Sequence, residues 1–293
     1  MSVSVDADGG YLVPETTEAE IGRRLSAMSP IRSIASVRTV SGSVYKKPFA
    51  ATGPQVGWVA ETAARPETPQ GTLAELNFPT MELYAMPAAT STLLDDSAVD
   101  IDAWISEEVE LAFAEQESAA FVNGDGVTQP TGFMTAPTVD DGSWSWGSLG
   151  TVATGASGAF DDSDALVDLI YALKSGYRQN ASFVMNRKTQ AEIRKLKDAD
   201  GNYIWAPPAS AGQSASLMGF SVVEAEDKPD IAADSNAIAF GDFRRGYLIV
   251  DRTGVRVLRD PYSSKPYVLF YTTKRVGGGI QDFEAIKLLN FSA

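Results

Sequence analysis

The side chains that could carry chemistry in this chain are carboxylates, serines and lysines, because the sequence contains no cysteine and no histidine. This absence excludes disulfides, thiolate and imidazole metal sites, cysteine nucleophiles and every histidine-based triad. Carboxylate acid–base catalysis, a serine–lysine dyad and a carboxylate metal site are the arrangements that remain. An enzymatic function would have to rest on one of them.

A Ser-x-x-Lys spacing occurs at Ser43 and Lys46. On a helix this spacing places a lysine beside a serine nucleophile. Here it lies in a run typical of a β-strand, where residues three apart face opposite sides. We therefore expect no serine–lysine dyad.

One segment has part of the spacing of a calcium-binding loop. Asp198, Asp200 and Asn202 match its first ligands, but Tyr203 stands where the turn glycine belongs and Ala209 where the bidentate glutamate belongs. We interpret this segment as a turn.

Two acidic pairs, Asp95–Asp96 and Asp161–Asp162, precede predicted helices. Acidic residues in that position usually cap the helix rather than bind a cation. Gly277-Gly278-Gly279 is not followed by a predicted helix, and no Gly-Lys pair occurs, so a phosphate-binding loop is not supported. We expect neither a metal nor a cofactor, and we expect the protein not to be an enzyme.

The net charge of −14 is unevenly distributed along the chain. Between Pro48 and Leu173 there are twenty Asp and Glu and one basic residue, Arg65, so this stretch carries −19 and the remainder +5. An acidic surface repels a phosphate backbone and gives no affinity through counterion release, which argues against a dedicated nucleic-acid-binding protein. It either keeps the protein soluble or lies beside nucleic acid without binding to it.

The length of 293 residues and the apolar content of 44% suit one large domain or two moderate ones with a sizeable core. No apolar run approaches the roughly 18 residues that a membrane helix needs. Met1 to Gly10 lacks the basic-then-apolar order of a signal peptide. No repeat is visible, so solenoids and propellers are not expected.

The elements that would position any functional residue begin with two segments that have little core of their own. Residues 1 to about 30 contain Gly9-Gly10, Pro14 and Pro30 around an amphipathic stretch, Thr17 to Met28, and indicate an extended arm with one helix. From Ser43 to Met86, strand-like runs (Ser43 to Phe49 and Leu73 to Met86) flank a segment rich in Pro and Gly, which predicts a long two-stranded hairpin.

This hairpin would carry Val56, Trp58 and Val59 far from any core. An isolated hairpin is marginally stable in water, and an exposed tryptophan is typical of a surface that another molecule covers. We interpret Trp58 as an anchor between subunits; a locally tucked aromatic is the alternative.

Helical spacing of apolar residues predicts one long helix from Asp100 to Val122, ending at Asn123-Gly124. At 1.5 Å per residue it would be roughly 35 Å long. The patterns predict further helices and strands in the order Ala165 to Ser175 (helix), Phe183 to Met185 (strand), Lys188 to Leu196 (helix), Phe220 to Val223, Ala237 to Phe240, Gly246 to Val250, Val255 to Leu258, Tyr267 to Arg275 and Phe283 to Leu289 (strands). Turns are expected at Gly241-Asp242, Arg252 to Gly254 and Gly277 to Gly279. An α+β fold of interleaved subdomains follows.

Three segments, in order, resemble the major capsid proteins of tailed double-stranded DNA phages, the family with the Hong Kong 97-type capsid fold. They are Gly9-Gly10-Tyr11-Leu12-Val13-Pro14-Glu15, then Gly57-Trp58-Val59-Ala60-Glu61, and then Asn123-Gly124-Asp125-Gly126 through Gln129-Pro130-Thr131-Gly132-Phe133. Each is short, but their order and spacing cover most of the chain. The resemblance extends to phage-derived gene transfer agents.

The resemblance implies a division of the chain into named parts. These are an N-terminal arm with the entry to the peripheral domain (1–42), an extended E-loop hairpin (43–90), the peripheral domain with its spine helix 100–122 (91–160), the axial domain (161–234), peripheral-domain strands (235–275) and a C-terminal strand that returns to the axial domain (276–293).

The resemblance also implies a function and partners. The protein would assemble with itself into pentamers and hexamers of an icosahedral-type shell that encloses double-stranded DNA without binding a specific sequence. A portal and possible decoration or scaffold proteins would join it in a virion or phage-like particle assembled in the bacterial cytoplasm, with no membrane involved. The residues expected at contacts between subunits are Tyr11, Val56, Trp58, Val59, Glu61 and Arg65.

Two features depart from the family pattern. The crosslinking member of the family joins an E-loop lysine to a neighbour's asparagine, but no lysine lies between Pro48 and Leu173. We therefore expect stabilisation by noncovalent overlap or by decoration proteins. Family precursors often carry a scaffolding segment before the arm; this sequence shows none, so it resembles a mature product or one that uses a separate scaffold.

Three alternatives stay open at this point. An encapsulin-type nanocompartment shares the fold, but its N-terminus tends to be helical, whereas Gly9-Gly10 and Pro14 favour an extended arm. A carboxylate-dependent hydrolase would depend on surplus acids such as Asp125. A tail-tube or adhesion protein would form tubes instead of closed shells.

Overall fold

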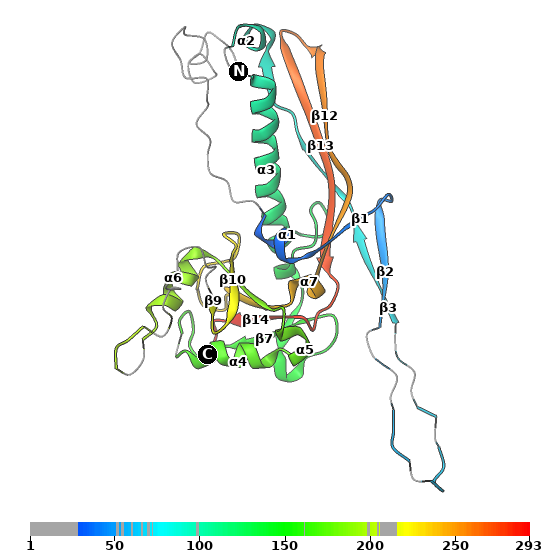
Figure 1. The fold of residues 1–293 in the computed structure, drawn as a ribbon, viewed down its shortest axis with the longest axis vertical. Coiled ribbons are helices and arrows are strands. Elements are labelled where there is room, and N and C mark those ends of the chain that lie inside the picture. The colour runs from blue at the N-terminus through cyan, green and yellow to red at the C-terminus, as the bar shows by residue number, and fades with distance from the viewer. Residues whose placement is uncertain are drawn as a thin grey trace.

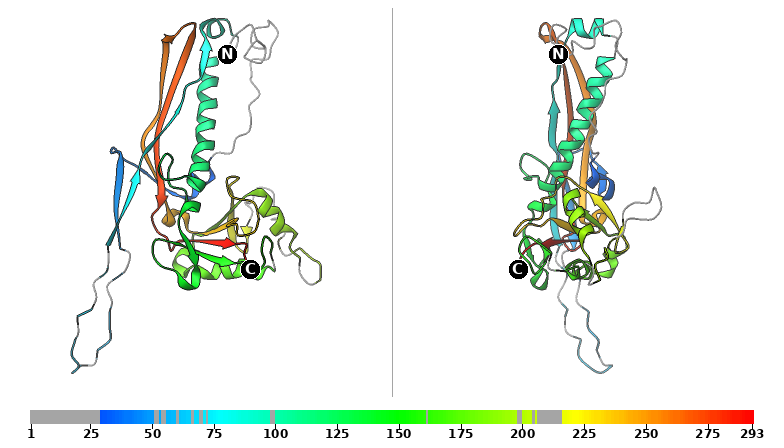
Figure 2. Two further views of the ribbon diagram at one scale, coloured as in Figure 1. Left: turned by 180° about the vertical axis from the view of Figure 1, so that it is seen from behind. Right: turned by 90° about the vertical axis from the view of Figure 1, so that its left-hand side faces the viewer.

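The molecule is elongated, with a long helix beside long strands at one end, a mixed helix-and-strand body at the other, and a projecting hairpin (Figures 1 and 2). The computed structural model describes residues 29–50, 53, 56–59, 61–65, 67, 68, 71, 73–97, 100–160, 162–197, 200–203, 205 and 216–293. The arm helix expected at Thr17 to Met28 and the candidate Tyr11 lie outside these residues.

The helices of the described residues are mostly short, with one exception of 23 residues. Their bounds are α1 Pro30–Ile34, α2 Ser91–Asp96, α3 Ile101–Asn123, α4 Asp164–Ala172, α5 Ser175–Arg178, α6 Arg187–Lys195 and α7 Phe243–Gly246, with 3₁₀ turns η3 Phe133–Thr135 and η4 Asp141–Ser143.

The strands of the described residues form three sheets. The five-stranded sheet contains β1 Ser36–Thr39, β12 Tyr247–Ser264, β13 Tyr267–Ile280 and β4 Met81–Ala85 in that order, with β5 Ala88–Thr90 also paired to β13. The seven-stranded sheet runs β6 Thr138–Asp140, β7 Leu149–Ala153, β14 Ile286–Asn290, β11 Ile238–Gly241, β8 Ser182–Met185, β10 Phe220–Glu224 and β9 Ser216–Leu217. The third sheet is the antiparallel pair β2 Val44–Ala50 and β3 Leu73–Pro79.

Helix α3 confirms the long helix expected from the apolar spacing. The Asp100 carboxylate accepts a hydrogen bond from the Ala103 N–H at 3.0 Å and so caps the first turn. Ile101, Ile105 and Val109 lie on one face of the helix and are buried in a cluster that includes Phe270 of β13. Burial of each such side chain contributes roughly 1.5–3 kcal/mol, which holds α3 against the five-stranded sheet.

The seven-stranded sheet has a core on both faces, because successive residues of its central strands point to opposite sides. In β8, Phe183 belongs to the cluster that includes Leu166 and Leu169 of α4, whereas Val184 belongs to the cluster that includes Phe121 of α3. The body is therefore a sheet between two apolar layers, and the end of α3 reaches one of them.

The expected strand from Leu73 to Met86 is wrong as a single element. It is interrupted at Thr80, and its two halves join different sheets: β3 pairs with β2, and β4 pairs with β13. An uninterrupted alternation of residues shows that the chain is extended, but it does not show which neighbour each half pairs with.

Two expected turns are also wrong. Arg252 to Gly254 lies inside β12, where register shifts mark irregular pairing with β13, and Gly277 to Gly279 lies inside β13. Glycine clusters usually mark turns, but inside a strand they mark a bulge or a close approach of another backbone. The β12–β13 hairpin is therefore much longer than the sequence pattern indicated.

Candidate assembly surfaces

The root of the β2–β3 hairpin is held against the body by aromatic packing and by side-chain hydrogen bonds. Phe49 of β2 stacks on Trp146 with ring centroids 5.9 Å apart, and Trp146 meets Phe283 edge to face at 5.4 Å. Lys47 Nζ donates to Gln281 Oε1 at 2.7 Å. The hairpin therefore leaves the body from a defined point.

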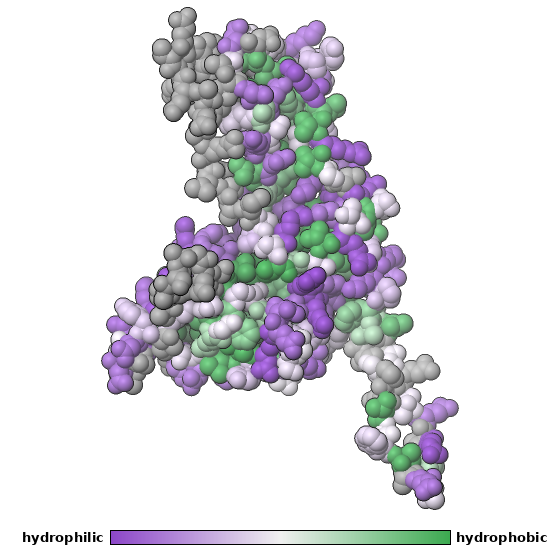
Figure 3. Space-filling model, in the orientation of Figure 1, coloured by the Kyte–Doolittle hydropathy of each residue, from purple (hydrophilic) through white to green (hydrophobic). Residues whose placement is uncertain are grey.

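Beyond this root, the hairpin carries its apolar residues in the open. Val56 and Trp58 are 92% and 106% exposed, and Val59 is 42% exposed. Glu61 and Arg65 are exposed as well. Figure 3 shows hydrophobic residues on the projecting loop, away from the body. The structure thus places five of the six expected contact residues together on one loop; Tyr11 is outside the described residues.

The third resemblance segment forms a tight loop after α3. The Asp125 carboxylate accepts hydrogen bonds from the N–H groups of Val127, Thr128 and Gln129 at 2.9–3.0 Å and from the Thr128 hydroxyl at 2.8 Å. The backbone hydrogen bonds, that from Val127 foremost, hold the pKa of Asp125 far below its usual range. Such a carboxylate is a poor proton donor or acceptor at neutral pH. Asp125, the residue on which the hydrolase alternative depended, is therefore poorly suited to acid–base catalysis.

This loop, the end of α3 and the glycine triplet of β13 meet at one junction. Tyr247 Oη donates to the Thr131 carbonyl at 2.7 Å, and the Thr131 N–H donates to the Gly278 carbonyl at 3.1 Å. A Cβ at Gly277 would lie 2.2 Å from the Pro79 carbonyl oxygen, and one at Gly278 would lie 2.7 Å from Tyr247 Oη. The glycines let β13 pass this close to its neighbours.

An ion cluster beside α3 was missed by the sequence reasoning. The side chain of Glu117 is only 2% exposed and pairs with Arg32, at 2.8 Å, and with Lys274. Arg32 also donates to Asp251 at 2.7 Å. The signal in the sequence is a single glutamate at the four-residue spacing of Phe113 and Phe121, on the buried face of the helix.

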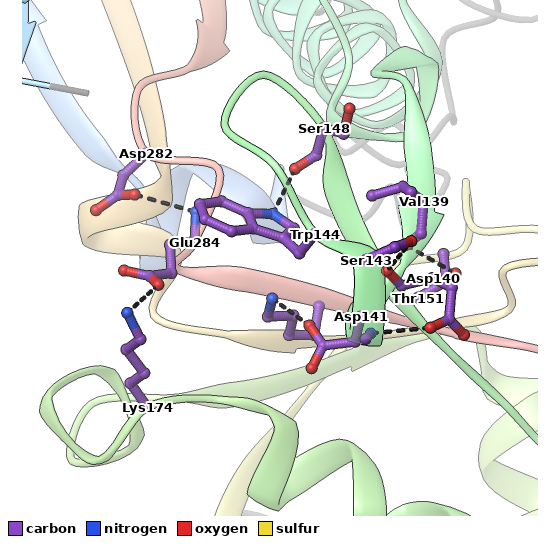
Figure 4. A network of polar contacts seen from close by, with 12 residues as sticks. Val139, Asp140, Asp141, Ser143, Trp144, Ser148, Thr151, Lys174, Asp282 and Glu284 are labelled. Carbon is purple, nitrogen blue, oxygen red and sulfur yellow. Dashed lines mark hydrogen bonds and ion pairs between the residues drawn. The ribbon is translucent and has the colours of Figure 1, made fainter. Parts of the chain in front are cut away.

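A second polar network ties the loop after β6 to β14 (Figure 4). The buried Lys287 Nζ lies 2.5 Å from an Asp141 carboxylate oxygen and 5.2 Å from the centre of the Trp144 ring. Trp144 Nε1 donates to the Ser148 carbonyl at 2.8 Å, and Lys174 pairs with Glu284 nearby. These contacts order the loop that carries Trp146, and therefore the surface on which Phe49 of the hairpin root packs.

The motifs considered for catalysis and metal binding do not come together as sites in the described residues. Lys46 lies in β2 and pairs with Glu75 of β3 at 2.7 Å, as a surface ion pair. Within this part of the chain, no three His, Cys, Asp or Glu side chains are grouped as a metal site would require. Asp198 and Asp161 fall outside it. Among the described helices, none is both long and apolar enough to cross a membrane.

The arrangement is that of a packed body with an exposed apolar loop, and comparison with known proteins assigns the chain to a family. The model of the phage capsid family matches residues 9–291. The chain belongs to the phage capsid family. This confirms the resemblance that the three short segments carried. A comparison with curated protein sequences gives no match.

Solved structures similar to this capsid-family chain agree with that assignment. The capsid of a native GTA particle, computed with C5 symmetry, is 52% identical, with a TM-score of 0.91 over 100% of this chain and 99% of that one. The capsid of the empty GTA particle is 51% identical, with a TM-score of 0.89 over the full length of both chains. A Microbacterium phage Oxtober96 chain is 16% identical, with a TM-score of 0.70 over both full lengths, and shows the shared fold. The expected α+β capsid fold is confirmed.

Proposed function

We propose that this protein is the major capsid protein of a particle of the gene-transfer-agent or tailed-phage type, and that its copies form the shell. The observation that carries the proposal is the likeness, along the whole chain, to the capsid subunit of a gene transfer agent particle. A shared fold alone would not establish a function. Here about half of the residues are also identical along the whole chain, so the family supports the function.

The proposed domains correspond to the sheets. The five-stranded sheet with α3 would be the peripheral domain, with α3 as its spine, and the seven-stranded sheet would be the core of the axial domain. The β2–β3 hairpin would be the E-loop. Because β7 and β11 pair within the seven-stranded sheet, this proposal assigns them to the axial domain, whereas the sequence-based division placed them in the peripheral domain.

The proposed partners are other copies of this chain, arranged as pentamers and hexamers. A closed point-group arrangement supplies cover for segments that a single copy leaves exposed, such as the loop around Trp58. A portal at one vertex, possible scaffold or decoration proteins and enclosed double-stranded DNA complete the proposal, with assembly in the bacterial cytoplasm. The acidic stretch supports enclosure without tight binding, since it offers phosphate groups no counterion release.

The test is electron microscopy of the purified protein after size-exclusion chromatography. Closed shells or capsomer rings are the expected result. A uniform monomer or small dimer, even with crowding agents, would overturn the proposal. Packaged DNA would separate this function from that of an encapsulin-type compartment, which would contain a cargo protein.

A variant tests the role of the loop within that function. Trp58→Ala should raise the protein concentration needed for assembly by about tenfold or more, because buried aromatic anchors dominate interface energies. Val127→Ala is the matched control, since Val127 is 77% exposed on a different loop. Equal assembly of the two variants would show that Trp58 is not an anchor.

A further inference from the structure

A cavity of about 300 Å³ lies where β1, β2 and α7 meet, beside the root of the hairpin (Figure 1). Its volume is at the small end of the range of ligand pockets, roughly 300–1,000 Å³. Its charged lining consists of four cations and one carboxylate, which is unusual for a chain with a net charge of −14. The cations are Arg38, Lys47, Arg244 and Arg245, and the carboxylate is Asp282.

A buried amide, the side chain of Gln281, positions charged groups on two sides of this cavity. Gln281 is 6% exposed. Its Oε1 accepts a hydrogen bond from Lys47 Nζ at 2.7 Å, and its Nε2 donates to the Arg244 carbonyl at 3.1 Å. The lysine of β2 is therefore held in place relative to α7. Because its partner is a neutral amide, the ammonium is oriented without being neutralised.

Arg38 and Arg244 also keep their charge. The Arg38 guanidinium donates to the Tyr45 hydroxyl at 2.8 Å, and its central carbon lies 5.5 Å from the centre of the Tyr45 ring. Both contacts are with a neutral side chain, so they fix the direction of the guanidinium and leave it cationic. Arg244 is exposed, and within the described part of the chain its side chain forms no ion pair.

Two carboxylates offset part of this positive charge. Asp242, whose side chain is 2% exposed, lies 3.9 Å from the Arg245 guanidinium and forms a long ion pair with it. Asp282 accepts hydrogen bonds from Tyr177 Oη at 2.8 Å and from the Glu284 N–H at 3.1 Å. With both carboxylates counted against the four cations, the cavity and its immediate surroundings have a net charge of +2.

These properties match a compact dianion with several acceptor oxygens. A phosphate group has this charge and shape, and the planar fork of an arginine binds two phosphate oxygens at once. The chain as a whole is negative and repels anions at long range. Salt screens that repulsion within roughly 8 Å at physiological ionic strength, so the four nearby cations decide what binds in the cavity.

We propose that the cavity binds a phosphate group, held by Arg38 and Lys47 on the side of β1 and β2 and by Arg244 and Arg245 of α7. The chemistry is that of the phosphate oxygens, whether they belong to free phosphate, to a phosphate ester or to DNA. A bound phosphate links β2 to α7 beside the contact of Phe49 with Trp146, and so stiffens the hairpin root. This inference does not depend on the function proposed above.

Calorimetric titration of the purified full-length chain with inorganic phosphate tests the site. At roughly physiological salt, and below the concentration at which the chain assembles, we expect one saturable site per chain. Sulfate should compete for it, and chloride at equal ionic strength should not. Arg244→Gln and Lys47→Gln should each weaken phosphate binding about tenfold or more, because each removes a charge-assisted hydrogen bond.

Lys46→Gln is the matched control, because it makes the same change of charge one position earlier in β2. Successive residues of a strand face opposite sides, and Lys46 pairs with Glu75 at the surface. This variant should bind phosphate as the unaltered chain does. The absence of saturable binding to the unaltered chain, or an equal loss in Lys46→Gln and Lys47→Gln, would overturn the proposal.

Thermal unfolding separates loss of the site from loss of folding. Phosphate should raise the Tm of the unaltered chain and of Lys46→Gln above the value in chloride of equal ionic strength, because a ligand that binds only the folded state stabilises it. Arg244→Gln should still unfold cooperatively but without this increase. The same increase in all three proteins would contradict binding in the cavity.

Three probes identify the source of the phosphate: inorganic phosphate, adenosine monophosphate and a short duplex DNA without terminal phosphates. Duplex binding that inorganic phosphate displaces and that Arg244→Gln loses assigns the site to the DNA backbone. Binding of the two small probes alone assigns it to free phosphate or a phosphate monoester. Either result supports the proposal, and binding of none overturns it. A chain that forms shells but binds no probe contradicts only this inference, whereas a chain that binds phosphate but never forms shells contradicts only the proposed function.

Discussion

Lys228 is a buried amine that is not paired with a carboxylate in the described part of the structure. It is 3% exposed, donates to the Asn236 carbonyl at 2.7 Å, contacts Met134 Sδ at 2.9 Å and lies over the Phe133 ring. Burial lowers its pKa from 10.5 to about 7. The charged form is disfavoured in the folded state because the site is apolar.

This shift predicts a pH dependence of stability. Between about pH 7 and 10.5 the unfolded chain holds a proton that the folded chain has released, so the free energy of unfolding rises with pH. Relative to Lys228→Met, the unaltered subunit should gain up to about 1.4 kcal/mol per pH unit in this window. Urea unfolding of unassembled subunits at several pH values measures the difference, and parallel stability curves for the two proteins would contradict it.

Glu117 gives a second prediction. Glu117→Gln leaves the charges of Arg32 and Lys274 without their shared partner and should lower the free energy of unfolding by about 3 kcal/mol. Glu110→Gln on the same helix is the control, because Glu110 is exposed, and it should change stability by less than about 0.5 kcal/mol. Equal effects of the two substitutions in urea unfolding would show that the cluster contributes little.

For individual residues, the sequence predicted which side chains are exposed better than it predicted which side chains form ion pairs. Val56 and Trp58 are exposed as their Pro- and Gly-rich surroundings indicated. The partners of Glu117 come from α1 and β13, far apart in the chain, and no local pattern connects them. A glutamate on a buried helix face signals that a partner exists, but only the fold identifies it.

Among the elements, the glycine triplet of β13 carries the sharpest constraint. The triplet lies close to Pro79 and Tyr247, at the junction where β13 meets the end of α3 and the loop that follows it. A side chain there must displace backbone atoms, which are less able to move than the end of a flexible side chain.

Two alanine substitutions in the same strand pair test this constraint. Gly277→Ala should destabilise the subunit by more than about 3 kcal/mol or prevent folding, because the added Cβ would lie 2.2 Å from a carbonyl oxygen. Gly254→Ala in β12 has nothing within 4 Å of the added Cβ and should be nearly neutral. Soluble yield and thermal unfolding of the two variants provide the comparison, and equal behaviour would show that β13 can shift.

The length and position of α3 followed from the sequence because a long helix repeats its apolar spacing many times. The strands were less predictable. Strand alternation does not encode the partner, so the change of sheet at Thr80 was invisible. Gly277 to Gly279, where the sequence indicated a turn, still belong to β13.

For the whole molecule, the distribution of lysines predicts how a shell would be held together. The segment from Pro48 to Leu173 contains no lysine, so the hairpin loop cannot form an isopeptide bond through its own amine. Boiled particles should therefore run as a single monomer band on a denaturing gel. A ladder of covalent oligomers that resists reduction would contradict this expectation.

The sequence identified the family because three motifs keep their order along a chain that the family model matches almost throughout. It did not reveal that Arg38, Lys47 and Arg244 line one cavity at the hairpin root, because β1, β2 and α7 are separated in the chain and meet only in the fold. The contact expected at the loop stays a prediction.

The hairpin root bears on how identical subunits accommodate unequal neighbours. The β2–β3 pair shares no strand pairing with either larger sheet, and its root is held by side-chain contacts such as Phe49 on Trp146. Packed side chains permit small sliding, whereas a ladder of backbone hydrogen bonds resists it. Backbone hydrogen bonds thus hold the two strands of the hairpin to each other, whereas the root can slide slightly against the body. In the proposed shell, fivefold and sixfold surroundings would differ in the angle between adjacent copies, and a small shift at the root would meet both while the rest of the subunit stays the same.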